Sequence, residues 1–391
     1  MNKISTIGIE EIGFYTTNAV FSLRELAKRN NQDVAKYTSG LSQEQMSVIT
    51  PDEDIITMSY NAVMEFLNDS NKETIDLLLF ATESAVDNSK SSAGELHNLL
   101  NLSNSCRCLE IKHACYGGTG ALMLAKNYVI ANPDKKALVV MSDIAFYGLK
   151  SKGEPTQGCG AVALLISSQP KIATFNNDSV FLADNKNDFY RPIYQVNPIY
   201  DGHFSIKCYL AMFEKALTKY YQKNNSFDYL ITHMPFAKML DKCCKIANVD
   251  FLINQNDIIK KYCSIIGNTY TASLYIGFLS LLENSTVDLS GKQICLFSYG
   301  SGCECEMFSL TLLDGYKKYL HYANHKEMID NRVVLDYEKY CLLWKQFENR
   351  EKSLNWKLEE CDYNFISKER IKIRLYEINN GIRLYEKIFR Q

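Results

Sequence analysis

The segment IDLLLFATES, residues 75–84, limits the possible fold more than any other part of the 391-residue chain. It is apolar at consecutive rather than alternate positions, which is typical of a strand buried on both faces. Further strand-like runs at residues 106–112, 136–143 and 161–166 follow it. Helix-patterned residues 54–67 precede it, and a second helical run, 120–130, lies between two of the later strands. Alternating strands and helices predict an α/β protein in which helices pack on largely parallel sheets.

A comparable order of elements recurs after residue 170. Helix-patterned residues 204–221 precede a strand-like run at 227–233, and helical segments at 236–248 and 271–283 precede strands at 292–298 and 304–313. We therefore predict two halves, residues 1–170 and 171–391, that share this order of elements. The charged and aromatic tail after Gly315 is predicted to form surface helices that act as a solvated cover.

Composition and charge exclude several classes of protein. A net charge of −2 leaves no basic excess to neutralise phosphates, so no nucleic-acid partner is expected. Thirteen cysteines, without a secretory signal near the N-terminus, favour reduced thiols in the cytoplasm. The longest apolar run, residues 274–282, is too short to cross a membrane. Cysteine pairs such as Cys243-Cys244 do not have the spacing of zinc ligands, so we expect no metal site.

Cys115 lies in the stretch EIKHACYGGTG, residues 110–120, between a strand-like run and a helical run. A thiol at the start of a helix lies near the positive end of the helix dipole, which predicts a lowered pKa and a nucleophilic thiolate. The glycines allow a substrate to approach the backbone closely. The alternative is a buried structural cysteine beside a tight turn.

Other strands also end in chemically capable residues. Glu83, His233 and the YGSG turn at residues 299–302 follow buried strands, and ligands of open α/β sheets bind at the carboxyl ends of strands. Together with Cys115 they would supply a nucleophile, a base, a hydrogen-bond donor and an oxyanion site. The alternatives are a helix cap for Glu83, a structural histidine for His233 and a simple turn. The glycine-rich loop at 153–160 is a weak phosphate-binding signal.

Seven sequence motifs that occur in a fixed order indicate the class of protein more specifically than the spacing of single residues does. Together the motifs resemble the 3-hydroxy-3-methylglutaryl-CoA synthase family, over about residues 7–319. That resemblance implies a thiolase-like fold, with two similar halves in a five-layer α-β-α-β-α arrangement, and a homodimer. The motifs are LLLFATESAVDNSKSSAGELHNLL, ACYGGTGALMLA, YGLKSKGEPTQGCGAVALLI, DFYRP, HMPFAKM, IGNTYTASLY and FSYGSG.

The resemblance also implies a reaction. Cys115 looks like the nucleophile that takes the acetyl group from acetyl-CoA as a thioester. Glu83 looks like the base that removes a proton from the acetyl methyl group, so that the acetyl carbon adds to the ketone of acetoacetyl-CoA before hydrolysis. His233 looks like the residue that positions and polarises the acetoacetyl carbonyl. Apart from the coenzyme A thioesters, no cofactor is implied.

Four further residues match positions that bind substrate in the family. Tyr147 is similar to a tyrosine that lines the active site, and Asn268 to a hydrogen-bonding contact with acetoacetyl-CoA. The backbone of Ser301 is similar to part of the oxyanion site, and Lys238 to a lysine near the CoA phosphates.

The chain departs from the family pattern at two positions and also resembles a sister group. His113 stands where a carboxylate or amide is more usual, and Phe146 where many bacterial members have arginine, so both are expected to alter the pocket or the CoA contacts. The run FSYGSGCECE is similar to the polyketide β-branching synthases, which use groups bound to an acyl carrier protein. Lys238, the short loop before GEPTQGCG and the long tail favour the mevalonate-pathway type. A non-catalytic acyl-CoA-binding scaffold would have no use for Glu83, Cys115 and His233 together.

Overall fold

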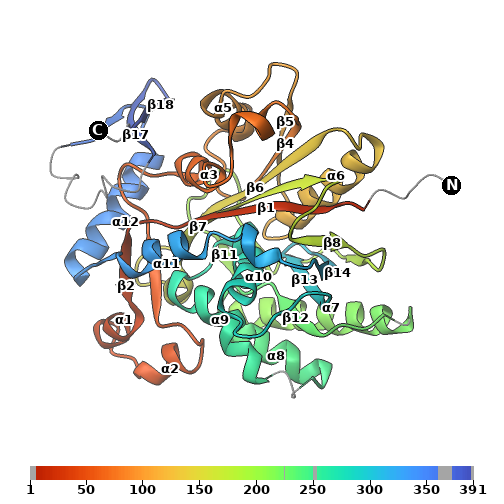
Figure 1. The fold of residues 1–391 in the computed structure, drawn as a ribbon. Coiled ribbons are helices and arrows are strands. Elements are labelled where there is room, and N and C mark those ends of the chain that lie inside the picture. Colours follow the sequence, from red (N-terminus) through yellow and green to blue (C-terminus); the bar gives the residue numbers. More distant parts are fainter. Residues whose placement is uncertain (1–5, 224, 250–252, 360–371, 389–391) are drawn as a thin grey trace.

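The computed structural model describes residues 6–223, 225–249, 253–359 and 372–388. Strands and helices alternate along most of the chain (Figure 1). The strands are β1 Gly8–Tyr15, β2 Ala19–Ser22, β3 Gln45–Val48, β4 Ile75–Ala81, β5 Arg107–Ile111, β6 Lys136–Ala145, β7 Gly158–Ser167, β8 Ala173–Phe175, β9 Val180–Ala183, β10 Phe189–Tyr190, β11 Ile199–Tyr200, β12 Tyr229–Thr232, β13 Gln293–Gly300, β14 Glu304–Leu312, β15 Val333–Val334, β16 Trp356–Lys357, β17 Ile373–Asn379 and β18 Ile382–Lys387. The α-helices are α1 Leu23–Arg29, α2 Val34–Thr38, α3 Ile55–Val63, α4 Asp69–Lys72, α5 Ser92–Leu100, α6 Gly117–Ala131, α7 Gly202–Gln222, α8 Lys238–Ala247, α9 Ile253–Ile266, α10 Ser273–Asn284, α11 Tyr322–Asp330 and α12 Tyr337–Glu351.

One ten-stranded sheet runs through the molecule in the order β12-β13-β14-β8-β1-β7-β6-β4-β5, and β9 pairs with β14. In the first half, β1 and β6 both run antiparallel to β7, and β4 runs parallel to β6 and β5. The second half repeats this pattern, because β9 and β13 both run antiparallel to β14 while β12 runs parallel to β13. The two halves are therefore similar, as predicted, but the sheet is mixed rather than largely parallel.

The short strand β8 joins the two halves. It pairs with β1 on one side and with β14 on the other, so the hydrogen-bonded ladder continues from one half into the other. Around this sheet the buried apolar side chains form one main core. The predicted boundary at residue 170 falls just before β8 and stays a prediction.

Helix α3 shows how the sequence places helices against the sheet. Its N-terminus is fixed by a capping box, in which the Asp54 carboxylate accepts from the Thr57 N–H while the Thr57 hydroxyl accepts from the Asp54 N–H. Every residue of α3 is buried, as expected for a helix without a polar face. The helix ends at Val63, earlier than the predicted residue 67. The sequence Ser22-Leu23-Arg24-Glu25 has the spacing that predicts a capping box before α1, but this prediction is wrong, because the Ser22 side chain makes no cap hydrogen bond.

The C-terminal tail is not the solvated cover that its composition predicts. It contains α11 and α12 but also a separate three-stranded sheet, β16-β17-β18, at the left of Figure 1. Trp344 and Tyr340 of α12 are fully buried, and their rings stack on Phe146 and Phe21 at centroid distances of 4.9 and 4.1 Å. Aromatic side chains bury large apolar areas, so this tail belongs to the core.

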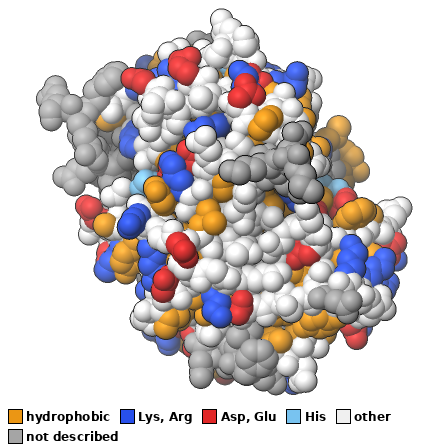
Figure 2. Space-filling view, turned by 45° about the vertical axis from the view of Figure 1, so that its right-hand side comes forward, with side chains coloured by type: hydrophobic (Ala, Val, Ile, Leu, Met, Phe, Trp, Pro, Cys, Tyr) orange, Lys and Arg blue, Asp and Glu red, His pale blue; other side chains and the backbone are white. Residues whose placement is uncertain are grey.

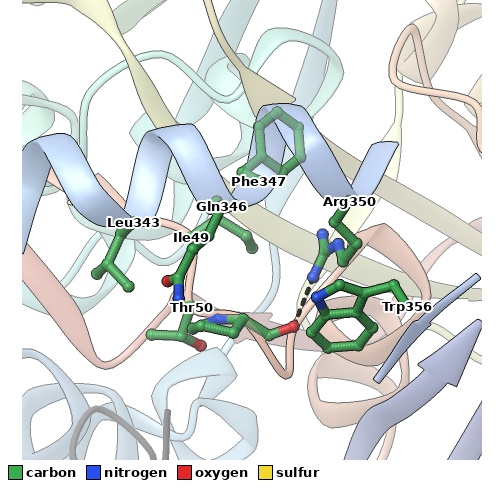
Figure 3. A pocket seen from close by; sticks show the side chains of 8 residues that line it. Ile49, Thr50, Leu343, Gln346, Phe347, Arg350 and Trp356 are labelled. Carbon is green, nitrogen blue, oxygen red and sulfur yellow. Dashed lines mark hydrogen bonds between the residues drawn. The ribbon is translucent and has the colours of Figure 1, made fainter. Parts of the chain in front are cut away.

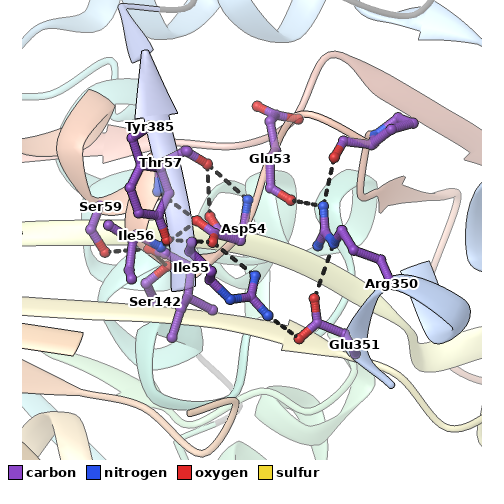
Figure 4. A network of polar contacts seen from close by, with 12 residues as sticks. Glu53, Asp54, Ile55, Ile56, Thr57, Ser59, Ser142, Arg350, Glu351 and Tyr385 are labelled. Atoms are coloured by element: carbon purple, nitrogen blue, oxygen red, sulfur yellow. Dashed lines mark hydrogen bonds and ion pairs between the residues drawn. The ribbon is translucent and has the colours of Figure 1, made fainter. Parts of the chain in front are cut away.

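Polar contacts attach the small sheet to the body of the protein (Figure 4). Tyr385 of β18 donates to the Asp54 carboxylate at 2.8 Å, and Arg383 donates to the same carboxylate at 3.0 Å. Arg350 of α12 donates to the main-chain oxygens of Pro51 and Glu53 at 2.7 and 2.8 Å. The carboxylate that caps α3 is therefore also the anchor of the C-terminal sheet.

A small cavity lies beside Arg350, where its guanidinium packs on the rings of Phe347 and Trp356 (Figure 3). Its volume of about 10 Å³ leaves room for at most one water molecule. Its lining does not include any residue predicted to react or to bind substrate. This cavity is therefore a packing defect of the tail, too small for a ligand.

Two surface properties bear on the sequence predictions. On the face shown in Figure 2, acidic and basic side chains lie interspersed, in keeping with the net charge of −2. No helix among the described residues combines the length and the apolar character needed to cross a membrane. Apart from these surface properties, one helix differs from the expectation: no helix was predicted from the sequence where α9 lies.

Candidate active site

The thiol of Cys115 and the carboxyl of Glu83 are in direct contact. Glu83 follows the buried strand β4, and Cys115 lies between β5 and the first turn of α6. The Cys115 Sγ donates to Glu83 Oε1 at 3.1 Å. Both residues keep a partial opening to solvent. The two strand ends therefore bring together the predicted nucleophile and the predicted base.

The thiol does not have the lowered pKa that its place before a helix predicts. Burial and the adjacent Glu83 carboxylate raise the pKa of Cys115 well above its ordinary value, and this outweighs the helix dipole. Burial and the carboxylate of Asp143 likewise raise the pKa of Glu83 to about 8. The resting pair is therefore a neutral thiol beside a weakly acidic carboxyl, and the prediction of a preformed thiolate is wrong.

The main chain of Glu83 is held by side chains rather than by a strand ladder. Its N–H donates to Asp143 Oδ1 at 2.8 Å, and its carbonyl oxygen accepts from Arg191. Asp143 also accepts from the hydroxyls of Thr82 and Thr271 at 2.8 and 2.5 Å. The next helix, α5, begins only at Ser92 with Ser91 as its cap, so the interpretation of Glu83 as a helix cap is wrong.

The YGSG turn packs directly on the cysteine loop. A side chain at Gly300 would lie 2.7 Å from the main-chain oxygen of His113, so only glycine allows this approach. On its other side the turn is fixed by Asp188, which accepts from the Gly302 N–H at 3.0 Å and from the Tyr299 hydroxyl at 2.8 Å. Ser301 therefore lies on a rigid turn next to the loop that carries Cys115.

His233 lies at the end of β12, next to β13. Its N–H donates to the Phe297 oxygen at 2.8 Å, and its carbonyl accepts from the Tyr209 hydroxyl at 2.7 Å. The residue is buried, and burial lowers the pKa of His233 to about 3. Its imidazole is therefore neutral and can donate or accept a hydrogen bond, but it is not a charged acid at neutral pH.

Tyr147 and Asn268 form one hydrogen-bonded unit. The Asn268 amide donates to the Tyr147 hydroxyl at 3.1 Å and accepts from the Tyr270 N–H at 2.9 Å. The Tyr147 N–H donates to Gln157 Oε1 at 2.9 Å. Burial and the neighbouring Cys115 raise the pKa of Tyr147, which keeps the hydroxyl neutral beside the thiol. These residues form a neutral wall of the site.

The glycine-rich loop supports that wall and shows no feature of a phosphate cradle. Its Glu154 is fully buried and accepts from the Tyr340 hydroxyl at 3.0 Å and from the Lys150 N–H at 2.9 Å. A buried carboxylate at this place would repel a phosphate. The phosphate-binding interpretation is therefore disfavoured.

Lys238 begins α8 and lies apart from the hydrogen bonds described above. Its side chain is 42% exposed and pairs with Asp241 at 3.1 Å, and Lys260 pairs with the same carboxylate at 3.0 Å. It is accessible to an anion from solvent, which is what a contact with CoA phosphates requires. Within the described parts of the chain, no group of three or more histidine, cysteine or acidic side chains could hold a metal ion.

The two departures from the family pattern have different surroundings. His113 faces Glu304, with Nδ1 3.6 Å from the carboxylate, and its ring lies edge-on to Tyr116. Phe146 is buried against Trp344 and Phe347 of α12. The structure therefore assigns Phe146 to the packing of the tail, whereas His113 lies beside the cysteine loop.

Three residues of this site were missed in the sequence analysis: Asp143, Asp188 and Arg191. Asp143 ends the run KALVVMSD, and Asp188 and Arg191 both lie in the motif DFYRP, so all three stood inside segments already singled out. A pattern shows that a segment matches, but it does not show which of its side chains turns toward the reacting groups.

The comparisons with known proteins agree with this geometry. The family model described as "Hydroxymethylglutaryl-coenzyme A synthase N terminal" matches residues 3–171, and its C-terminal counterpart matches residues 179–266 and 258–369. A hydroxymethylglutaryl-CoA synthase from Enterococcus faecalis is 38% identical and covers 97% of this chain and 99% of its own length. A polyketide-biosynthesis 3-hydroxy-3-methylglutaryl-ACP synthase, PksG of Bacillus subtilis, is 30% identical over 86% of this chain and 88% of its own.

A solved structure, described as HMG-CoA synthase complexed with CoA, is also similar. It is 34% identical, its TM-score is 0.91, and the match covers 98% of this chain and all of that one. Two similar α/β halves with a cysteine and a glutamate at neighbouring strand ends define an enzyme of the thiolase-like fold. The chain belongs to the hydroxymethylglutaryl-CoA synthase family.

Proposed function

We propose that this protein condenses acetyl-CoA with acetoacetyl-CoA and hydrolyses the product from the enzyme to give hydroxymethylglutaryl-CoA and CoA. The observation that carries the proposal is the 3.1 Å hydrogen bond from Cys115 to Glu83, because it joins a nucleophile to a base. The membership of the family over nearly the full chain supports the same reaction.

In the first step, Cys115 sulfur attacks the thioester carbon of acetyl-CoA. Because the resting thiol is neutral, its proton must leave as the carbon–sulfur bond forms, and the ionised Glu83 carboxylate is the acceptor in contact with it. Coenzyme A departs as the thiolate and takes the proton from Glu83, which returns Glu83 to its ionised form. The Ser301 backbone is proposed to stabilise the oxyanion of the tetrahedral intermediate.

In the second step, the ionised Glu83 takes a proton from the acetyl methyl group. The carbon formed adds to the ketone of acetoacetyl-CoA, and the resulting alkoxide recovers a proton from Glu83. His233 is proposed to donate a hydrogen bond from its neutral imidazole to the acetoacetyl carbonyl, with Asn268 as a further contact and Lys238 near the CoA phosphates. Water then cleaves the thioester bond to the Cys115 sulfur. This hydrolysis releases hydroxymethylglutaryl-CoA and regenerates Cys115 as a thiol.

Mass spectrometry of the intact protein tests the nucleophile. We expect acetyl-CoA to add one acetyl group at Cys115, and Cys115→Ser to lose that group. We expect Glu83→Ala still to accept the acetyl group, with solvent in place of Glu83 as the acceptor of the thiol proton, because removing the carboxylate also removes one cause of the raised thiol pKa. We expect it to form no condensation product. Normal condensation by Glu83→Ala would remove Glu83 as the base.

We place this enzyme in the mevalonate pathway of isoprenoid biosynthesis rather than in polyketide β-branching. The higher identity to the Enterococcus faecalis enzyme than to the carrier-protein enzyme of Bacillus subtilis supports this assignment. The acetylated protein is offered acetoacetyl-CoA and, separately, an acetoacetyl acyl carrier protein. Turnover of the carrier-bound substrate alone would establish the polyketide type instead.

We also propose that the protein forms a homodimer, needs no cofactor beyond the coenzyme A thioesters, and acts in the cytoplasm. Strand β5 ends the large sheet, and its Leu109 is 47% exposed, so it offers unpaired backbone groups and apolar surface to a second copy. The cysteines of the described residues are all free, which supports a reducing compartment. Light scattering of the wild type and of Leu109→Lys tests the dimer, and an unchanged mass would exclude this edge.

A further inference from the structure

Residues 184–201, between β9 and α7, run along the active site and are named the strap. At one end its main chain pairs with the last residue of the YGSG turn and the residue after it. Asp184 and Cys303 exchange two main-chain hydrogen bonds of 2.9 and 2.7 Å, and the Lys186 N–H donates to the Gly302 oxygen at 2.7 Å. The strap is thus fixed to the turn that carries the proposed oxyanion site.

The middle of the strap packs on the neutral wall of the site. Phe189 and Tyr200, on the paired strands β10 and β11, lie edge-on to the ring of Tyr147 at centroid distances of 6.1 and 5.5 Å. Phe189 also packs on Tyr270 at 6.0 Å. Arg191 follows Phe189 by two residues. Its side chain extends from this anchored segment and donates to the carbonyl oxygen of Glu83.

Arg191 is one of the few contacts that hold the main chain at Glu83. The residues after it, 84–91, form no helix or strand, so no regular ladder fixes the peptide groups on either side of the carboxyl. Asp143 accepts from the Glu83 N–H and Arg191 donates to the Glu83 carbonyl oxygen. The peptide group before Glu83 is therefore held from β6. The one after it is held from the strap through its oxygen, while its N–H, from Ser84, donates to Thr82 Oγ1 at 2.9 Å.

We propose that Arg191 is a positioning residue for the base of the condensation step, which the strap holds against the Glu83 carbonyl so that the carboxyl stays in line with Cys115. The inference rests on the proposed function, and it goes beyond that function by giving a role to a residue that the proposed mechanism does not use. The pyrrolidine ring of Pro192, directly after Arg191, restricts the strap at this point.

The charge of Arg191 gives the proposal a second, measurable consequence. Five groups face the Glu83 carboxyl: Asp143 from β6, Arg191 from the strap, Cys115 from the nucleophile loop, and the neutral Tyr147 and Tyr270. Burial and Asp143 raise the pKa of Glu83, whereas Arg191 lowers it. Removal of the guanidinium therefore leaves a carboxyl that is both less well placed and harder to ionise.

The test follows proton removal by Glu83 directly. Wild type, Arg191→Gln and Arg191→Lys are acetylated with acetyl-CoA and transferred to D₂O, and deuterium in the acetyl group on Cys115 is measured by mass spectrometry from about pH 6 to about pH 10. The control is Tyr194→Ser, because Tyr194 lies on the same strap with its side chain 80% exposed. Acetylation itself is recorded for every variant.

For Arg191→Gln we expect deuterium exchange to slow by about tenfold to a hundredfold, as is typical when a hydrogen bond to a charged group is lost. The pH at which exchange reaches half of its maximum rate, the exchange midpoint, should move to higher pH in this variant. Acetylation should change little, and Tyr194→Ser should match the wild type. Arg191→Lys keeps the charge but not the planar fork, so we expect slower exchange with the midpoint nearly in place.

Three results separate failure of the inference from failure of the function. If wild-type Cys115 takes up acetyl but Arg191→Gln exchanges at the wild-type rate and midpoint, the inference is overturned. If Arg191→Gln does not fold, as judged by circular dichroism, an unchanged exchange rate in Arg191→Lys overturns it instead. If wild-type Cys115 takes up no acetyl group, the proposed function fails and the inference fails with it.

Discussion

His325 provides the sharpest test of how the two halves are held together. It lies on α11, is completely buried, and stands between two carboxylates: Nδ1 is 2.6 Å from Glu283 of α10, and Nε2 is 2.7 Å from Glu65, which follows α3. Burial opposes a charge on this ring, but the Glu65 and Glu283 carboxylates outweigh burial and raise the pKa of His325 to about 10. The imidazole is therefore a cation at neutral pH.

The contribution of the charged His325 to the free energy of folding follows from the difference between its pKa values in the folded and unfolded states. A rise from 6.5 to about 10 corresponds to about 5 kcal/mol of folding free energy. Because the folded-state pKa is the higher one, this stabilisation is complete below pH 6.5 and is lost as the pH rises through about 10. Removing one member of a buried ionic group typically costs about 3–5 kcal/mol. We therefore expect His325→Gln to lower the free energy of unfolding by about 3–5 kcal/mol at pH 7.

The assay is urea unfolding followed by circular dichroism, at pH 7 and again near pH 10.5. The difference between wild type and His325→Gln should be large at pH 7 and should shrink at the higher pH, where the wild type has lost its cation as well. Lys326→Ala is the matched control, because Lys326 is the next residue on α11 with its side chain 57% exposed. A difference below about 1 kcal/mol at pH 7, or one that does not change with pH, would refute the reasoning.

Three further predictions concern the site and the tail. Asp143→Asn removes a carboxylate that raises the pKa of Glu83, so the midpoint of deuterium exchange into the acetyl-enzyme should fall below its wild-type value; a rise would contradict this. Burial raises the pKa of Glu53 to about 8, so wild-type stability falls as the pH rises from 4.5 to about 8. The stability of Glu53→Gln relative to the wild type, measured as the urea midpoint, should therefore increase across that pH range. A stability difference that does not change with pH would contradict this prediction. Trp344→Ala should lose about 3–5 kcal/mol in urea unfolding, whereas a solvated tail would lose less than about 1 kcal/mol.

Much of the fold follows from local pattern. The apolar run of β4 and the strand-like runs of β6 and β7 locate the first half of the sheet, and the motif order identifies the family before any contact is known. The contact between Glu83 and Cys115 is also predictable, because both follow strands that pair in parallel and therefore end at the same edge.

The rest depends on contacts between distant segments. The pKa of Cys115 is set by the carboxyl that packs against it, and sequence position reveals only the helix dipole. The tail looks solvated because its charges are frequent, whereas the burial of Trp344 depends on a partner, Phe146, almost two hundred residues earlier. The role of Arg191 cannot be predicted for the same reason, since the group to which it donates is a main-chain oxygen 108 positions away in the sequence.

The division of the site between the halves also bears on how the chain is made. The thiol and the carboxyl belong to the first part of the chain, but the strap, Asn268 and the YGSG turn are synthesised later. A growing chain that has just passed Cys115 therefore carries a thiol without the wall and the oxyanion turn proposed to make it reactive toward thioesters. We expect ribosome-bound fragments that end before residue 300 to take up no acetyl group, so that reactivity toward acetyl-CoA marks the completed fold.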